Sequence, residues 1–115
     1  MFIATLIVTT LFALVLFFSA YGKLVRDPQQ MRTLDHVGFP ARWVPLLAAA
    51  ETAGAAGILI GLAWPPLGVA AALGLIGYFT GAVASHLRVR DWRIQSSAVL
   101  LLVAVATLVL RLASF

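Results

Sequence analysis

The amino-acid sequence predicts an all-α fold, an integral membrane four-helix bundle. Of the 115 residues, 63% are hydrophobic and 10% are charged, whereas soluble domains carry roughly 25% charged residues. The apolar residues form four runs, each close to the roughly 20 residues that a helix needs to cross the hydrocarbon core of a bilayer. The runs lack polar/apolar alternation and are too long for membrane strands. We therefore expect residues 1–115 to form one transmembrane domain in contact with the lipid bilayer.

The first predicted span covers residues 2–21. A cleaved secretory signal is the alternative, but this run lacks a basic start and basic residues follow it, so we favour a retained helix. The polar segment 22–42 comes next. It is long enough for an interfacial helix or a re-entrant turn, and it is the only polar connection of that length.

The second and third predicted spans cover residues 43–63 and 67–86. Between them, the sequence Trp-Pro-Pro predicts a tight turn because two prolines cannot continue a helix. The connection Leu-Arg-Val-Arg-Asp-Trp separates the third span from the fourth, residues 94–112. Amphipathic indole rings favour the membrane interface, and all three tryptophans lie at predicted span ends: Trp43, Trp64 and Trp92.

The distribution of basic residues predicts the orientation. Seven cations lie in loops 22–42 and 87–93 and at the adjoining span starts: Lys23, Arg26, Arg32, Arg42, Arg88, Arg90 and Arg93. The other side carries Arg111 alone. By the positive-inside rule, we expect a multi-pass protein of the cytoplasmic membrane with both loops in the cytoplasm and both termini outside.

Glu51 is the candidate functional residue, because it lies in an otherwise apolar run about 12 Å past the start of the second span. An acid at this depth costs about 2.5–3.5 kcal/mol on insertion scales, so it should face other helices and hold a proton or meet a cation. The alternative is a purely structural role, in which Glu51 hydrogen-bonds a neighbouring helix.

The ends of the other three spans share this depth and supply the expected partners of Glu51. These are Ser19, Tyr21, Lys23, Ser85, His86, Gln95, Ser96 and Ser97. Such a segregation of polar groups predicts a pocket in the inner leaflet. The alternatives are that Lys23 extends to lipid phosphates, that His86 faces the headgroups, and that Tyr21 and Tyr78 are packing residues. His36 is expected to be an ordinary loop residue.

Two stripes of small residues predict a close antiparallel pair of the second and third spans. Gly54, Gly57 and Gly61 recur at helical spacing on one, and Gly74, Gly77, Gly81 and Ser85 recur on the other. Such stripes let helix backbones approach closely in lipid.

Several kinds of chemistry lack support in the sequence. The chain has no cysteine and only two histidines, fifty residues apart, so we expect no metal site and no intrinsic cofactor. The cations flank the spans and form no independent basic surface, so we expect no nucleic-acid partner.

With these residues in view, the chain resembles the DoxX-like family of small four-helix membrane proteins. The resemblance covers nearly the whole length and depends on FFSAYGKL, ETAGAAGILIGL and GAVASHLR, which belong to the first three spans. Many relatives carry a glycine before the loop acid, where this chain has Arg90. The resemblance implies a bundle in the cytoplasmic membrane and favours a redox or quinone-associated role.

Two functions stay open. The first is an accessory subunit that binds a quinone or another lipophilic small molecule, with an oxidoreductase partner protein or a homo-oligomer. Its ligand-binding residues would be Glu51, Lys23, Tyr21, Ser19, Ser85 and Gln95. The second is a small cofactor-free membrane enzyme, an isomerase, epoxide opener or cyclase, with Glu51 as general acid and His86 or Tyr21 as a second proton-transfer group. A permease is a weaker third option.

Overall fold

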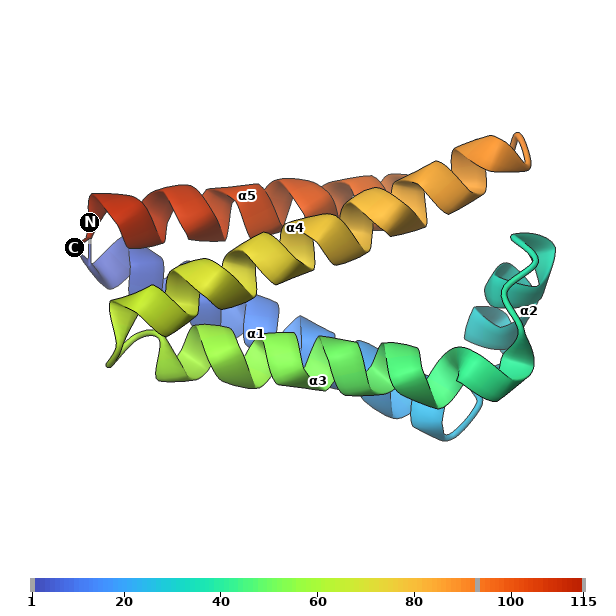
Figure 1. Cartoon of the computed structure of the whole chain (residues 1–115), viewed down its shortest axis with the longest axis horizontal. Helices are drawn as coiled ribbons and strands as arrows, with labels where there is room; N and C mark the ends of the chain where they lie inside the picture. Colours follow the sequence, from blue (N-terminus) through green and yellow to red (C-terminus); the bar gives the residue numbers. More distant parts are fainter. Residues whose placement is uncertain (1, 93, 115) are drawn as a thin grey trace.

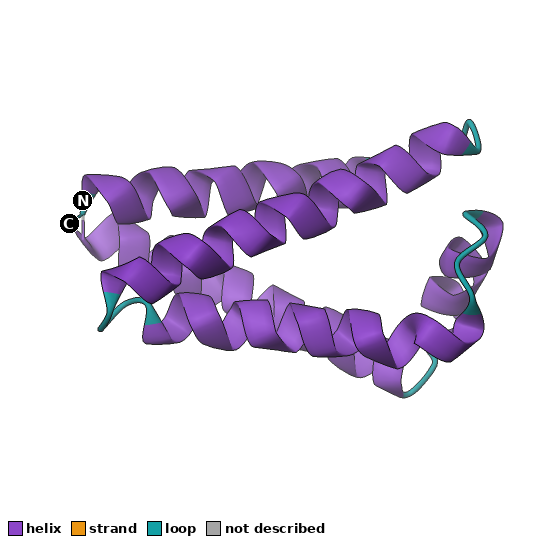
Figure 2. Ribbon diagram, in the orientation of Figure 1, coloured by secondary structure: helices purple, strands orange, loops and turns teal. Residues whose placement is uncertain are grey.

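The structure, a computed structural model, describes residues 2–92 and 94–114, so Arg93, one of the seven counted cations, lies outside the described residues. Among these residues there is no strand, and four helices are long and apolar enough to cross a membrane (Figures 1 and 2). They are α1 (Phe2–Leu24), α3 (Val44–Ile60), which the 3₁₀ turn η1 (Ala41–Trp43) precedes, α4 (Pro65–Arg88) and α5 (Gln95–Ala113). The predicted all-α membrane fold is confirmed.

The polar connection between the first two spans contains a fifth helix, α2 (Pro28–His36). The side chain of Asp27 caps its start by accepting a hydrogen bond from the backbone N–H of Gln30 at 3.2 Å. Pro28 occupies the first turn, where no N–H is needed. None of the residues of α2 is buried. Of the two possibilities for this segment, the structure shows a short helix at the end of the bundle opposite the termini (Figure 1).

Three helices end in the same way, with a residue in the left-handed conformation just past the end. The residues are Arg26 after α1, Gly38 after α2 and Arg90 after α4, with φ of 55°, 79° and 57°. After α4, the N–H of Asp91 donates to the carbonyl of His86 at 2.8 Å, which is the hydrogen bond of a Schellman motif. Arg90 therefore occupies a backbone conformation that glycine would adopt without strain.

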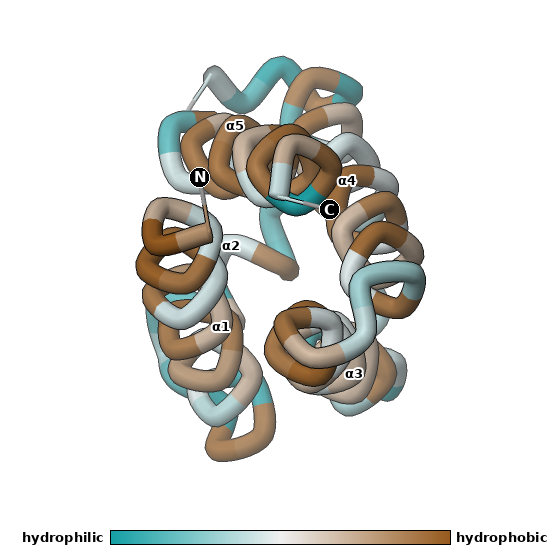
Figure 3. The backbone as a smooth tube through the Cα atoms, turned by 90° about the vertical axis from the view of Figure 1, so that its left-hand side faces the viewer, coloured by the Kyte–Doolittle hydropathy of each residue, from teal (hydrophilic) through white to brown (hydrophobic). Residues whose placement is uncertain are grey.

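The four long helices lie in a ring, so that each packs against two neighbours (Figure 3). The most extensive contacts join α1 with α3 and α4 with α5. Apolar side chains from α1, α3 and α4 fill the centre, and the largest are Phe12, Leu16, Ile58, Leu75 and Phe79.

The contact between α3 and α4 uses one of the two predicted glycine stripes. A Cβ atom on Gly57 would lie 2.7 Å from the Cβ of Ala71, and one on Gly61 would overlap the backbone of Gly68. The second stripe was wrongly assigned to this contact, because a Cβ on any of its glycines would meet nothing within 4 Å: Gly74, Gly77 and Gly81. The α4 face that meets α3 is instead formed by residues 68, 71 and 75, so the helix is rotated away from the stripe.

The two ends of the bundle differ. At the end with the termini, the Thr5 hydroxyl donates to the carbonyl of Leu110 at 3.0 Å, and Arg111 Nη1 donates to the carbonyl of Gly61 at 3.1 Å. The prolines of the Trp-Pro-Pro sequence begin α4 and do not form the turn itself. Toward the other end, which we call the α2 end, the α4–α5 pair and the α1–α3 pair diverge (Figure 1).

Candidate functional site

Glu51 lies inside the bundle, with only 1% of its surface exposed. Its Oε1 atom is 2.7 Å from Lys23 Nζ and accepts a hydrogen bond from the Ser19 hydroxyl at 3.3 Å. The Lys23 ammonium also donates to the Ser19 hydroxyl at 3.0 Å. An acid, a base and a hydroxyl thus form one compact polar cluster within the apolar bundle.

The local sequence explains why Ser19 and Lys23 act together. They are four residues apart on α1, and side chains at this spacing lie one above the other on the same helix face. Lys23 is itself buried, with 9% of its surface exposed. A buried carboxylate is strongly unfavourable unless it is paired, so the ion pair accounts for the presence of Glu51 at this depth. Of the two possibilities for Lys23, the structure shows pairing with Glu51 and not extension to the headgroups.

A residue from α2 completes the cluster. Gln30 Oε1 accepts a hydrogen bond from Lys23 Nζ at 3.1 Å, and Gln30 Nε2 donates to the Ser19 carbonyl at 3.3 Å. The Gln30 amide lies directly over Gly22, in space that any side chain at that position would fill. Gln30 was not predicted from the sequence, because no local pattern indicates where the connection folds back onto α1.

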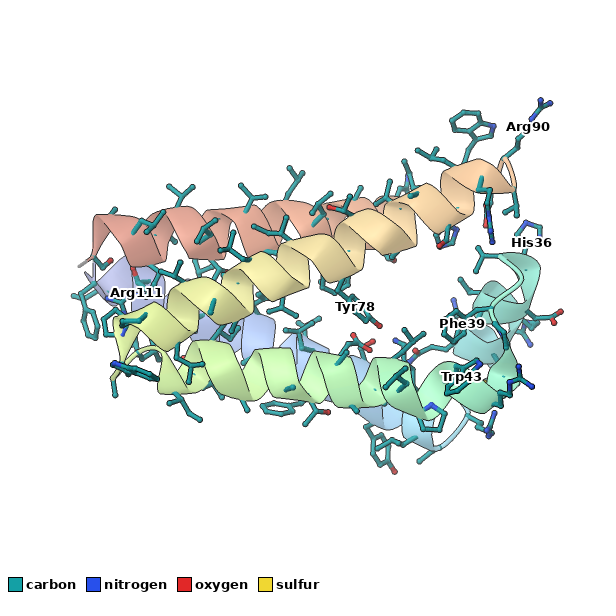
Figure 4. All side chains as sticks on the ribbon, in the orientation of Figure 1. His36, Phe39, Trp43, Tyr78, Arg90 and Arg111 are labelled. Atoms are coloured by element: carbon teal, nitrogen blue, oxygen red, sulfur yellow. The ribbon has the colours of Figure 1, made fainter. Side chains whose placement is uncertain are left out.

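Tyr78 approaches Glu51 from α4. Its half-buried side chain points toward α3 (Figure 4), and the phenol lies near the Glu51 carboxylate. Tyr78 was expected to be a packing residue. A phenol in the middle of an apolar span is an unusual polar group, and this was the available signal for a position at the depth of Glu51.

The structure does not bring four other candidate residues to Glu51. Tyr21 is 64% exposed, because it lies two residues past Ser19 on α1 and so points to the opposite face. His86 is buried with Nδ1 3.0 Å from Asp91 Oδ2, and so faces a loop acid and not the headgroups. The hydroxyl of Ser85 donates to the Gly81 carbonyl of its own helix, and Gln95 is exposed on α5.

His36 has a more defined position than an ordinary loop residue. It ends α2, and its Nε2 atom lies 3.7 Å from the Asp91 Oδ2 atom that also faces His86. In the described part of the chain, no group of three or more His, Cys, Asp or Glu side chains is arranged to hold a metal ion.

A groove of about 390 Å³ lies between α1 and α5, near the α2 end. Its lining is mostly apolar, with two polar side chains from the first turn of α5: Val15, Gln95, Ser96, Val99 and Leu100. Val15 lies one helical turn before Ser19 on the same face of α1. The groove therefore ends about one helical turn from Ser19, and none of the residues of the Glu51 cluster lines it.

The comparisons with known proteins agree with this architecture. The sequence model of the DoxX-like family matches residues 7–110, which include most of all four long helices. Neither the curated protein sequences nor the solved structures contain a significant match. The family match confirms the resemblance seen in the sequence, and the chain is a multi-pass membrane protein that belongs to the DoxX-like family.

Proposed function

We propose that this protein binds a quinone or another lipophilic small molecule as a membrane-embedded accessory subunit. The polar head of the ligand meets the cluster of Ser19, Lys23, Glu51 and Tyr78, and its apolar body lies in the groove between α1 and α5. One observation supports this most directly: Ser19, which hydrogen-bonds both members of a buried ion pair, lies one helical turn along α1 from Val15 in a lipid-facing groove. Ligand sites are typically apolar, measure about 300–1,000 Å³ and contain a few convergent polar groups.

The cluster suits a ligand head that accepts hydrogen bonds. The Lys23 ammonium and the hydroxyls of Ser19 and Tyr78 are donors from two helices, and a quinone carbonyl accepts from such groups. The chain has no cysteine, and its two histidines face Asp91 and not Glu51. A redox centre that exchanges electrons with the quinone therefore belongs to a partner protein in this proposal.

The structure gives less support to the enzyme hypothesis. A general acid needs a carboxyl group with a proton to donate, whereas Glu51 Oε1 accepts from Lys23 and Ser19. Neither His86 nor Tyr21 lies at the cluster to serve as the second proton-transfer group. Ligand binding, in contrast, requires only that the donor groups of Lys23, Ser19 and Tyr78 reorient toward the ligand.

The positive-inside rule supports the proposed orientation, with the α2 end in the cytoplasm. The exposed cations of the described residues lie at this end: Arg26, Arg32, Arg42, Arg88 and Arg90. The Glu51 cluster then belongs to the inner leaflet of the cytoplasmic membrane.

Photolabelling tests the proposal. The protein in nanodiscs is irradiated with an azido-quinone, and labelled peptides are mapped with and without excess decylubiquinone. We expect labelling that decylubiquinone suppresses, within residues 15–23 or 95–100. Lys23→Met/Glu51→Leu, which leaves no unpaired charge, should abolish this suppressible labelling, and Arg32→Met on exposed α2 should retain it. Labelling that excess quinone does not suppress, or that the double variant retains, would refute quinone binding at Glu51.

A further inference from the structure

We infer that the ligand reaches Glu51 sideways from the membrane, between α1 and α5, while α2 acts as a strap that closes the aqueous route. The identity of the ligand rests on the proposed function, whereas the route follows from the geometry. The inference restricts the ligand to molecules dissolved in the bilayer, and it excludes water-soluble metabolites and ions.

The first half of the strap covers the polar cluster from the α2 end. Gln30 reaches back to Lys23 Nζ and to the Ser19 carbonyl, and its amide fills the space above Gly22. These contacts lie between the ion pair and the loop side of the bundle. A water-borne molecule would have to displace Gln30 and break both hydrogen bonds to reach Glu51.

The second half of the strap is tied to the opposite helix pair. Arg88 Nη2, at the end of α4, donates to the Val37 carbonyl at 3.1 Å, and His36 Nε2 lies 3.7 Å from Asp91 Oδ2. Val37, Asp91 and His86 are all buried at this junction. The strap therefore spans from α1 to the α4–α5 connection and closes the end where the two helix pairs diverge (Figure 1).

The side of the bundle between α1 and α5 has no such cover. Val15 and Val99 line the groove with 48% and 56% of their surfaces exposed, within two helices that can span the membrane. Ser19, one turn along α1 from Val15, is half-buried, so its side chain is not fully enclosed. Apolar walls favour a lipophilic molecule that moves from the lipid into the groove, because its contacts with lipid are replaced by contacts with valine and leucine.

Thiol labelling tests the route without any quinone, because the chain has no cysteine of its own. Ser19→Cys in nanodiscs is treated with lipid-soluble N-phenylmaleimide or with a charged, membrane-impermeant methanethiosulfonate. Val25→Cys, at an exposed position just past α1, is the aqueous control. We expect Ser19→Cys to react with the maleimide, and its rate with the charged reagent to be about tenfold or more below that of Val25→Cys.

Two further variants separate the two routes. In the Ser19→Cys protein, Gln30→Ala should raise the rate with the charged reagent about tenfold by opening the strap, and Val15→Trp should slow the maleimide by filling the groove. Val109→Trp, exposed on α5 at the other end, should leave the maleimide rate unchanged. Tyr78→Cys reports on the same site from α4 if Ser19→Cys does not fold.

Three results would overturn the inference. The first is that the charged reagent reacts with Ser19→Cys as fast as with the aqueous control, Val25→Cys. The second is that the maleimide reacts with Ser19→Cys at the same rate whether Val15→Trp or Val109→Trp is present. The third is that the maleimide reacts with neither Ser19→Cys nor Tyr78→Cys. Photolabelling and thiol labelling are independent measurements. If quinone photolabelling fails but the thiol rates are as expected, quinone is refuted as the ligand and the lateral route is supported. The reverse combination refutes the route and keeps the ligand.

Discussion

Replacing Lys23 with methionine leaves the buried Glu51 carboxylate without the ammonium that lies 2.7 Å from its Oε1. Methionine retains a flexible, mostly apolar chain, so the change removes charge more than packing. Removing one partner of a buried ion pair costs about 3–5 kcal/mol. We therefore expect the free energy of unfolding to fall by about 3–5 kcal/mol at pH 7.

Titration with SDS in mixed micelles at pH 7, followed by far-ultraviolet circular dichroism, measures this loss. Arg32→Met removes an exposed cation of α2 and should change stability by less than about 0.5 kcal/mol. Lys23→Met/Glu51→Leu removes both charges and should recover most of the loss. A loss below about 1 kcal/mol at pH 7 for Lys23→Met would show that the ion pair does not govern stability as argued.

Four further substitutions can be followed by the same titration. Gly61→Ala places a Cβ against the Gly68 backbone and should cost about 1–3 kcal/mol, whereas Gly74→Ala, in open space on α4, should stabilise by about 0.5–1 kcal/mol; equal effects would contradict the observed helix rotation. Arg90→Gly replaces a residue held in the left-handed conformation, with φ of 57°, and should stabilise the protein by about 1 kcal/mol. An unchanged midpoint would show that the turn stores no strain. Arg111→Met removes the 3.1 Å donor to the Gly61 carbonyl and should cost about 1–3 kcal/mol; an unchanged midpoint would show that water satisfies this carbonyl.

The positions of the long helices could be predicted from the sequence with an error of a few residues. The first span was expected to end at residue 21, and α1 ends at Leu24. The third was expected over residues 67–86, and α4 covers Pro65–Arg88 because prolines are compatible with the first turn of a helix. These features depend on the length of apolar runs, which the bilayer thickness sets.

The glycine stripes show where this kind of prediction stops. Both stripes have the spacing of a helix face, but only the one with Gly57 and Gly61 meets the neighbouring helix. Residue spacing identifies which side chains share one face of a helix, but it does not determine which neighbour that face contacts. The rotation of α4 depends on its packing against α3 and α5 together, and that is a property of the whole bundle.

The sequence by itself determined that four apolar helices form and that Glu51 needs an interior position with a polar or cationic partner. The physical reason is local, because a hydrocarbon solvent accepts long apolar helices and makes an isolated charge costly. Only the tertiary structure decided that Lys23, Ser19 and Tyr78 lie at Glu51 and that Gln30 holds Lys23, while Tyr21 points away and His86 faces Asp91. Helix rotation and the path of the polar connection make that choice, and both depend on contacts between residues far apart in the chain.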